Sequence, residues 1–119
     1  MPSLVIHAPE YQLAREDTKS FDDIFRTGIG KGYALNSTIL RQVFPEGMIH
    51  PGWRVVLLCK DRGRERRAEG ELVRLEPAIK DGRPWFTKNR IRRYDVYVEN
   101  FEMVPYKSEA LNKNGVAVI

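Results

Sequence analysis

The side chains best suited to chemistry in this chain are basic groups and flat aromatic rings in its second half. From Trp85 to Tyr94 the sequence reads WFTKNRIRRY, which interleaves aromatic and basic residues. Proteins hold single-stranded nucleic acid with this combination, because bases stack on the rings while lysine and arginine meet the phosphates. The alternative is that the rings belong to the core, as most aromatic side chains do in small domains.

A group of arginines forms a second candidate, at and just after a predicted turn. A protruding hairpin rich in arginine can follow a phosphate backbone, and each contact adds a salt-dependent increment of affinity. The alternative is a solvated turn whose charge is partly balanced by neighbouring acidic residues. The members of this group are Arg62, Arg64, Arg66 and Arg67.

A glycine-rich segment is the third candidate. Gly28, Gly30 and Gly32 allow backbone N–H groups to converge, and Lys31 adds positive charge, so the segment is a candidate anion-binding loop ahead of a predicted helix. The nucleotide-binding fingerprints are absent, however. No Ser or Thr follows Lys31, and Tyr33 occupies the position of the last dinucleotide-binding glycine. An ordinary connection between two helices is the alternative.

Catalytic and metal-binding chemistry has little support in the sequence. Cys59 belongs to the apolar set of a predicted strand and is expected to be a small buried hydrophobe. His7 and His50 show no ligand spacing with it, so we predict no metal and no cofactor. No pair of carboxylates is marked out by position, and we therefore assign no catalytic residue.

Composition and charge place the chain among ordinary globular domains. Its 119 residues are 42% hydrophobic and 30% charged, with a net charge of +4. The segment from Trp53 to Arg93 contains 13 Lys and Arg and 6 Asp and Glu, whereas the rest of the chain contains 7 Lys and Arg and 10 Asp and Glu. A basic half of this kind is the electrostatic pattern expected for a polyanion partner. The alternative is that the arginines only solvate the faces of a hairpin.

The sequence also gives expectations about compartment. A single cysteine allows no internal disulfide, which favours a reducing environment. No secretory signal is visible, and no apolar stretch approaches the length of a membrane span. We expect a single cytoplasmic domain that makes no contact with a membrane.

A central hairpin is expected to organise the fold. Residues 53–60 (WRVVLLCK) are apolar on both alternating faces in their middle, which predicts a strand covered on both sides. A charged turn containing Gly63 follows, and residues 67–75 return as the partner strand. The apolar pattern of that strand changes face around Gly70, which predicts a β-bulge there.

Shorter elements are expected around the hairpin. Ser20 and Asn36 are typical helix N-caps, for helices that end at Gly28 and Phe44. Further strands are predicted at 3–7, 85–88 and 91–100. Residues 101–106 either continue the last of these or form a strand of their own after a bend, and residues 116–119 either close the sheet or fray. Together these predict one mainly β (α+β) domain, a small mixed or antiparallel β-barrel of five to six strands with two short N-terminal helices and a loose tail from residue 107.

One stretch resembles a known family. The segments IHPGWRVVLL (49–58) and RAEGELV (67–73) are similar to the pattern of PUA-like domains, in which a Pro/Gly turn starts a hydrophobic strand and a glycine-containing strand returns. The resemblance covers residues 49–75. It implies a pseudobarrel that binds RNA or modified bases. Trp53 replaces the acidic residue usual after the turn glycine, and the related ASCH pattern is absent around Lys31.

Three functional hypotheses follow. The first is a non-catalytic module that binds RNA or nucleic acid in general. The second is a small-molecule or nucleotide-binding domain, or an enzyme, that uses the loop at 28–32. The third is a protein–protein adaptor that pairs through an exposed strand edge or the C-terminal strand. For the first hypothesis we assign phosphate contacts to Lys31, Arg62, Arg64, Arg66, Arg67, Lys88, Arg90, Arg92 and Arg93, and stacking or pocket roles to Tyr33, Trp53, Trp85 and Tyr97.

Overall fold

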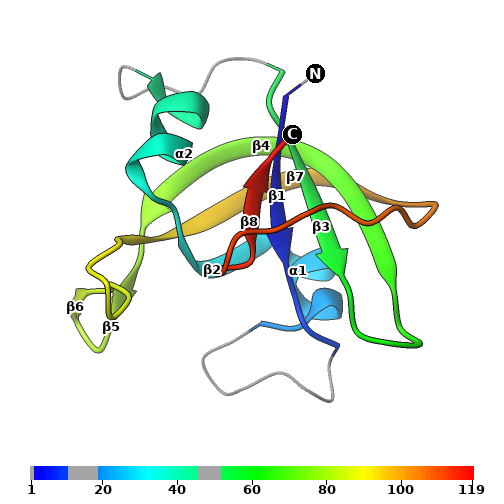
Figure 1. Ribbon diagram of the computed structural model, residues 1–119, viewed down its shortest axis with the longest axis horizontal. Coiled ribbons are helices and arrows are strands. Elements are labelled where there is room, and N and C mark those ends of the chain that lie inside the picture. The colour runs from blue at the N-terminus through cyan, green and yellow to red at the C-terminus, as the bar shows by residue number, and fades with distance from the viewer. Residues whose placement is uncertain (1, 11–18, 46–51) are drawn as a thin grey trace.

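A curled, six-stranded sheet forms the centre of the protein. The structure is a computed structural model that describes residues 2–10, 19–45 and 52–119. The strands are β1 (Ser3–His7), β2 (Ile29–Ala34), β3 (Arg54–Cys59), β4 (Arg66–Pro77), β5 (Ile79–Lys80), β6 (Arg83–Pro84), β7 (Arg93–Val104) and β8 (Val116–Val118), and the helices are α1 (Phe21–Thr27) and α2 (Ser37–Val43). Figure 1 shows the long strands β4 and β7 arching behind the shorter ones.

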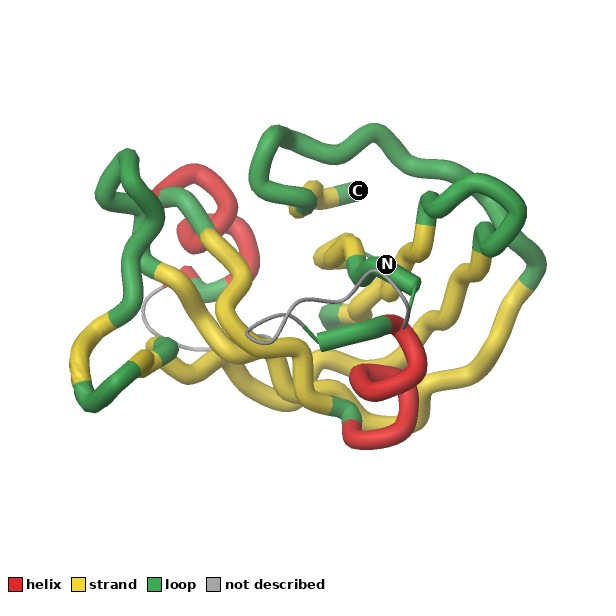
Figure 2. The backbone as a smooth tube through the Cα atoms, turned by 90° about the horizontal axis from the view of Figure 1, so that it is seen from below, coloured by secondary structure: helices red, strands yellow, loops and turns green. Residues whose placement is uncertain are grey.

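The sheet is mixed and only partly closed. Its strand order is β2-β7-β4-β3-β1-β8, with β1 and β3 parallel and the other neighbours antiparallel. The edge strands β2 and β8 do not pair with each other, so the sheet is a half-barrel, and its curl is visible in Figure 2. The predicted mainly β fold, a small mixed barrel-like sheet with two short helices, is therefore confirmed.

The central hairpin is β3 and β4, and β3 is covered on both faces as predicted. Val55, Leu57 and Cys59 point into the main core, where both helices bury their apolar sides. Val56 and Leu58 point the other way, into a small second cluster that includes Leu111 and Ala117 from the C-terminal segment. This second cluster explains why the strand lacks a polar face.

The predicted bulge is present where β4 pairs with β7. Their register shifts between Glu69 and Glu71, on either side of Gly70. A methyl group on Gly70 would lie 2.7 Å from the Val98 side chain and 2.8 Å from a β7 carbonyl oxygen. Glycine is therefore required here because the second strand approaches too closely for a side chain.

Both helices begin at the predicted caps. The hydroxyl of Ser20 accepts a hydrogen bond from the Asp23 N–H at 3.2 Å, and the Asn36 side chain accepts one from the Ile39 N–H at 2.9 Å. α1 ends at Gly28, which adopts the left-handed conformation with φ 74°. These side-chain bonds satisfy N–H groups that have no partner inside the helix.

Two predicted elements differ in the structure, and one open alternative is decided by it. Residues 85–88 do not form an edge strand, because the preceding hairpin β5–β6 and a turn take up this part of the chain. The segment at 29–34 is strand β2 rather than a loop. The C-terminal strand forms: β8 pairs with β1 and closes one edge of the sheet.

Neighbouring residues occupy hydrogen-bonding groups at the β8 edge of the sheet. The Asn112 side chain accepts from the Val116 N–H at 3.1 Å, and the Asn112 N–H donates to the Val116 carbonyl at 2.9 Å. These contacts leave less of that edge free to add a strand from a partner. On β2, the Gly32 N–H donates at 3.0 Å to the carboxylate of Asp95, which belongs to the paired strand β7. In the described ranges, no helix has the length and apolar character needed to span a bilayer.

Candidate nucleic-acid interface

A basic arm, defined here as residues 79–93, extends from the end of β4 and returns into β7 (Figure 1). Its first part is the β5–β6 hairpin, in which Ile79 pairs with Pro84. Its second part is a turn closed by a hydrogen bond from the Thr87 N–H to the Ile91 carbonyl at 2.9 Å. Pairing between Phe86 and Arg92 joins the two sides of the arm below that turn.

The basic residues of the arm are not neutralised by carboxylates. The segment contains six Lys and Arg but a single acidic residue, Asp81. Among the described residues, no ion pair joins a carboxylate to five of these cations. Those five are Arg83, Lys88, Arg90, Arg92 and Arg93. The arm is therefore a local concentration of uncompensated positive charge.

Two of these arginines are held by backbone carbonyls and aromatic rings. The Arg92 guanidinium donates to the Ala78 carbonyl at 3.0 Å and lies 5.3 Å from the Phe86 ring centroid. The Arg93 guanidinium donates to the Gly32 carbonyl at 2.7 Å and lies 5.0 Å from the Trp85 ring centroid. Carbonyl and ring contacts position the charge without cancelling it. Arg83, Lys88 and Arg90 are exposed.

Trp85 anchors the arm on the sheet. Its six-membered ring lies over Gly32 so closely that a methyl group at that glycine would lie 2.3 Å from a ring carbon. The Lys80 ammonium lies 4.9 Å from the centroid of the same indole. Trp85 is therefore a half-buried packing ring, and its position depends on the missing side chain at Gly32.

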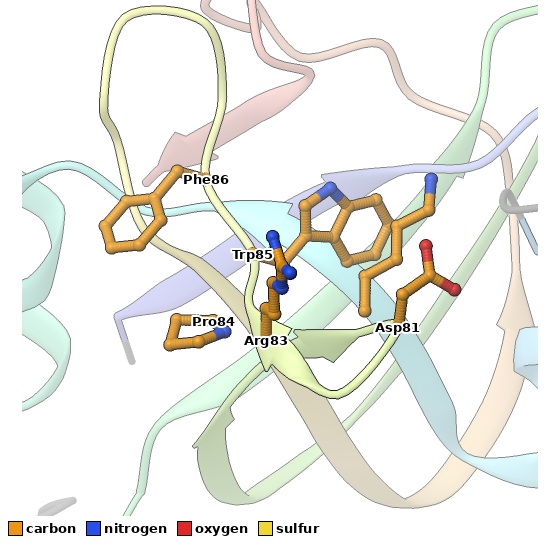
Figure 3. Close-up of a pocket in the computed structure, with 6 residues that line it drawn as sticks. Asp81, Arg83, Pro84, Trp85 and Phe86 are labelled. Carbon is orange, nitrogen blue, oxygen red and sulfur yellow. The ribbon is translucent and has the colours of Figure 1, made fainter.

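The arm encloses a shallow open recess of about 490 Å³ (Figure 3). In Figure 3 the Trp85 and Phe86 rings extend to opposite sides of the chain, and Pro84 lies on the Phe86 side. The Phe86 ring is 47% exposed. The residues that line the recess are Lys80, Asp81, Arg83, Pro84, Trp85 and Phe86.

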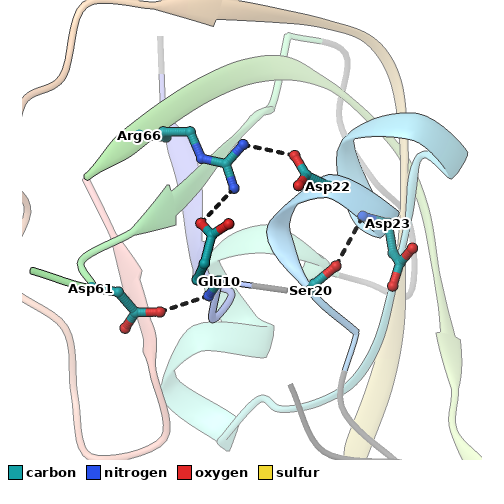
Figure 4. A network of polar contacts seen from close by, with 6 residues as sticks. All are labelled: Glu10, Ser20, Asp22, Asp23, Asp61 and Arg66. Carbon is teal, nitrogen blue, oxygen red and sulfur yellow. Dashed lines mark hydrogen bonds and ion pairs between the residues drawn. The ribbon is translucent and has the colours of Figure 1, made fainter. Parts of the chain in front are cut away.

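The arginines of the β3–β4 hairpin divide into two classes. Arg66 pairs with Glu10 at 2.8 Å and Asp22 at 2.7 Å, and its guanidinium lies 4.4 Å from the Phe21 ring centroid (Figure 4). Arg67 is 7% exposed and pairs with Glu69 and Glu109. The prediction that Arg66 and Arg67 contact phosphates is therefore wrong, because carboxylates of the same chain already occupy their donors.

Arg62 and Arg64 are exposed, but they lie in the turn before β4, whereas the arm follows it. β4 is 12 residues long, and Figure 1 places its two ends on opposite sides of the molecule. The two basic groups therefore do not converge on one surface. Lys31 is exposed on β2, beside the Thr27 and Arg26 end of α1.

Three of the four predicted stacking rings are covered. Trp53 is 8% exposed and belongs to the main core. The Tyr97 ring is covered by the Arg74 guanidinium, 3.8 Å from its centroid. The Tyr33 hydroxyl donates to the His7 carbonyl at 2.8 Å, and burial raises the pKa of Tyr33. These contacts give the three rings structural roles, and none of the three is among the exposed large hydrophobic side chains.

The Tyr33 hydroxyl donates its hydrogen bond to the carbonyl of the half-buried His7. A Tyr33→Phe variant lacks this hydrogen bond and is expected to lose about 1 kcal/mol of unfolding free energy. Urea denaturation of the variant and the wild type measures this difference. Tyr106→Phe is the control, because its ring is 41% exposed and its hydroxyl makes no hydrogen bond within the described residues. Equal stability of Tyr33→Phe and the wild type would contradict the structural role.

The glycine segment does not form an anion-binding loop. Gly28 ends α1, and Gly30 and Gly32 lie in β2, where each serves packing against a ring. A methyl group at Gly30 would lie 2.8 Å from the Tyr33 ring. The Gly32 N–H already donates to the Asp95 carboxylate. The loop prediction is wrong because these residues form a strand. A strand also requires glycine at positions where a bulky ring packs directly against its backbone.

Sequence reasoning did not include Lys80 and Arg83 in the candidate site, and it left Phe86 open between a stacking ring and a core residue. The composition KDGRP at 80–84 indicated only a turn. The signal that could have found them was the continuity of basic residues from Lys80 to Arg93, with a single acidic residue among them.

The other titratable groups do not form a second centre. Burial raises the pKa of the Cys59 thiol, and burial lowers the pKa of His7. Over the residues with described positions, no three His, Cys, Asp or Glu side chains gather as metal ligands would. Comparisons of the chain with protein-family models, curated proteins and solved structures found no match.

Proposed function

We propose that the protein binds nucleic acid, RNA in the first instance, through the basic arm and without catalysing a reaction on it. The observation that supports this best is the set of five cations that no carboxylate of the described chain pairs with. Arg83, Lys88 and Arg90 are exposed and free to meet phosphates. Arg92 and Arg93 are held beside rings, in the arrangement that suits stacked bases and phosphates together.

The contrast with the rest of the molecule supports the same proposal. Three arginines of β4, Arg66, Arg67 and Arg74, each have a carboxylate partner within 3.0 Å. The charges of this long strand are therefore neutralised within the chain. Leaving five cations unpaired in one short segment lowers stability through mutual repulsion, which favours a role in binding an anion.

The other two hypotheses have less support. The nucleotide-binding alternative relied on the loop at 28–32, which is a strand whose Gly32 N–H is already bonded. The adaptor alternative relied on an exposed strand edge or the C-terminal strand, and Asn112 already occupies hydrogen-bonding groups of the C-terminal strand β8. The PUA-like resemblance and the cytoplasmic location stay predictions.

The proposal is tested by fluorescence anisotropy with labelled single-stranded and double-stranded RNA at several salt concentrations. We expect binding at low salt, and a triple variant Arg83→Gln, Lys88→Gln, Arg90→Gln should bind about 10- to 30-fold more weakly. The slope of log affinity against log salt for single strands should fall by about 2, because three phosphate contacts are lost. Arg92 and Arg93 are left unchanged because they hold backbone carbonyls.

A matched control removes three charges elsewhere. Arg62, Arg64 and Lys113 are exposed outside the arm, and replacing all three by Gln lowers the net charge equally. This control should retain most of the affinity. Equal weakening by both triple variants would show that only net charge matters, and no binding by the wild-type protein at low salt would exclude the proposal.

A further inference from the structure

We infer that Phe86 is a stacking platform for one unpaired base, so that the arm prefers single-stranded to double-stranded nucleic acid. This inference rests on the proposed function and specifies its ligand. The first step is that Phe86 is the exposed ring of the arm, with 47% of its surface accessible. Trp85, the other ring of the arm, is half-buried against Gly32.

The second step is that most other rings of the described chain are buried or packed against the core. Phe25 stacks between Phe21 and Phe101, with centroids 6.3 and 6.1 Å apart. Tyr97 is covered by Arg74. Tyr106 is exposed, but it follows the far end of β7, away from the arm.

The third step is the surroundings of the Phe86 ring. The Arg92 guanidinium lies over one face of the ring, 5.3 Å from its centroid, so a base would stack on the other face. Pro84 lies on the same side of the chain (Figure 3). Arg83 lines the same recess as Phe86, and the exposed Lys88 and Arg90 follow within four residues of the ring in the sequence. A base on the ring would therefore place its own phosphates within a cationic environment.

The fourth step separates single strands from duplexes. In a duplex each base face is covered by its neighbours, so a protein ring can stack only where the strand is unpaired or unstacked. Phosphate contacts, by contrast, are available in both forms. A contribution from Phe86 should therefore appear with single strands and be absent with duplexes.

The test uses three labelled probes of equal length: a single-stranded RNA, the same strand in a duplex, and an abasic strand with the same number of phosphates. The wild-type protein should bind the single strand more tightly than the abasic strand. Phe86→Ala should weaken binding of the single strand by about 5- to 150-fold and leave duplex and abasic binding unchanged.

Two further variants control for folding and for apolar area. Phe86→Trp should retain single-strand binding because it keeps a stacking surface. Ile79→Ala removes an apolar side chain that is 67% exposed on the same arm, and it should have no effect. Far-UV circular dichroism of all three variants checks that the fold is intact.

The outcomes distinguish this inference from the proposed function. If the wild-type protein binds none of the probes at low salt, both fail. If it binds them and Phe86→Ala changes single-strand and duplex affinity equally or not at all, the stacking inference is overturned while the nucleic-acid proposal stands. The stacking inference would also be overturned if heparin and unlabelled single-stranded RNA displaced the labelled single strand equally well, both from the wild type and from Phe86→Ala. Binding would then depend on charge alone.

Discussion

Replacing Arg67 by alanine is expected to lower the free energy of unfolding by about 3–5 kcal/mol. The guanidinium donates to the Glu69 carboxylate at 3.0 Å, the Glu109 carboxylate at 2.9 Å and the Lys107 carbonyl at 2.9 Å. Burial opposes the charged form, but these hydrogen bonds outweigh it and raise the pKa of Arg67. The variant would leave Glu109, only 14% exposed, without its cation.

Arg74→Ala provides a matched control on the same strand. Arg74 also pairs with a glutamate two residues later, at 2.8 Å, but its side chain is 52% exposed. We therefore expect a loss below about 1 kcal/mol. Urea denaturation of both variants measures the difference, and hydrogen exchange should become faster across 107–118 in Arg67→Ala alone. Similar losses in both variants would show that burial does not strengthen the Arg67 contacts.

The second large effect is expected at Gly28, where alanine should cost about 2–4 kcal/mol of unfolding free energy. Its φ of 74° is unfavourable for any side chain, and a methyl group would lie 2.4 Å from the Val98 carbonyl oxygen. That oxygen belongs to the backbone of β7, which is fixed by pairing on both sides. The clash therefore has no flexible group that could move away.

Gly63→Ala separates the two causes. Gly63 has nearly the same φ, 77°, but nothing lies within 4 Å of the added methyl group. Its loss should be only the conformational part, about 1 kcal/mol. Thermal or urea unfolding of the two variants gives the steric part by difference. If both lose the same amount, the close approach of β7 to the end of α1 has no energetic consequence.

These expectations describe a scaffold that fixes some charges and leaves others available. Arg66 and Arg67 hold distant segments on the sheet, whereas the arm presents charge that the described chain does not neutralise. A variant of a paired arginine would lose stability, and a binding measurement on that variant would not separate this loss from a loss of affinity. The triple variant in the arm avoids that confusion, since its three exposed side chains make no hydrogen bond, ion pair or ring contact within the described residues.

Elements whose signals are local could be predicted from the sequence. Ser20, Asn36 and Gly28 mark helix ends through hydrogen bonds and backbone conformations that involve only nearby residues. The two apolar faces of β3 and the glycine at the bulge of β4 were also readable, because alternation and the absence of a side chain are properties of the strand itself. From these a small barrel-like sheet followed, mixed or antiparallel, and the structure then showed that β1 and β3 are parallel.

The tertiary structure alone decided which charged and aromatic residues are available to a ligand. Arg66 meets Glu10 across 56 residues of sequence, and Arg67 meets Glu109 across 42, so no local pattern could reveal that they are neutralised. The glycines at 30 and 32 resembled a phosphate loop until Tyr33 and Trp85 were seen to pack on them. Local sequence specifies backbone conformation, but exposure and pairing depend on long-range contacts that only the folded sheet brings together.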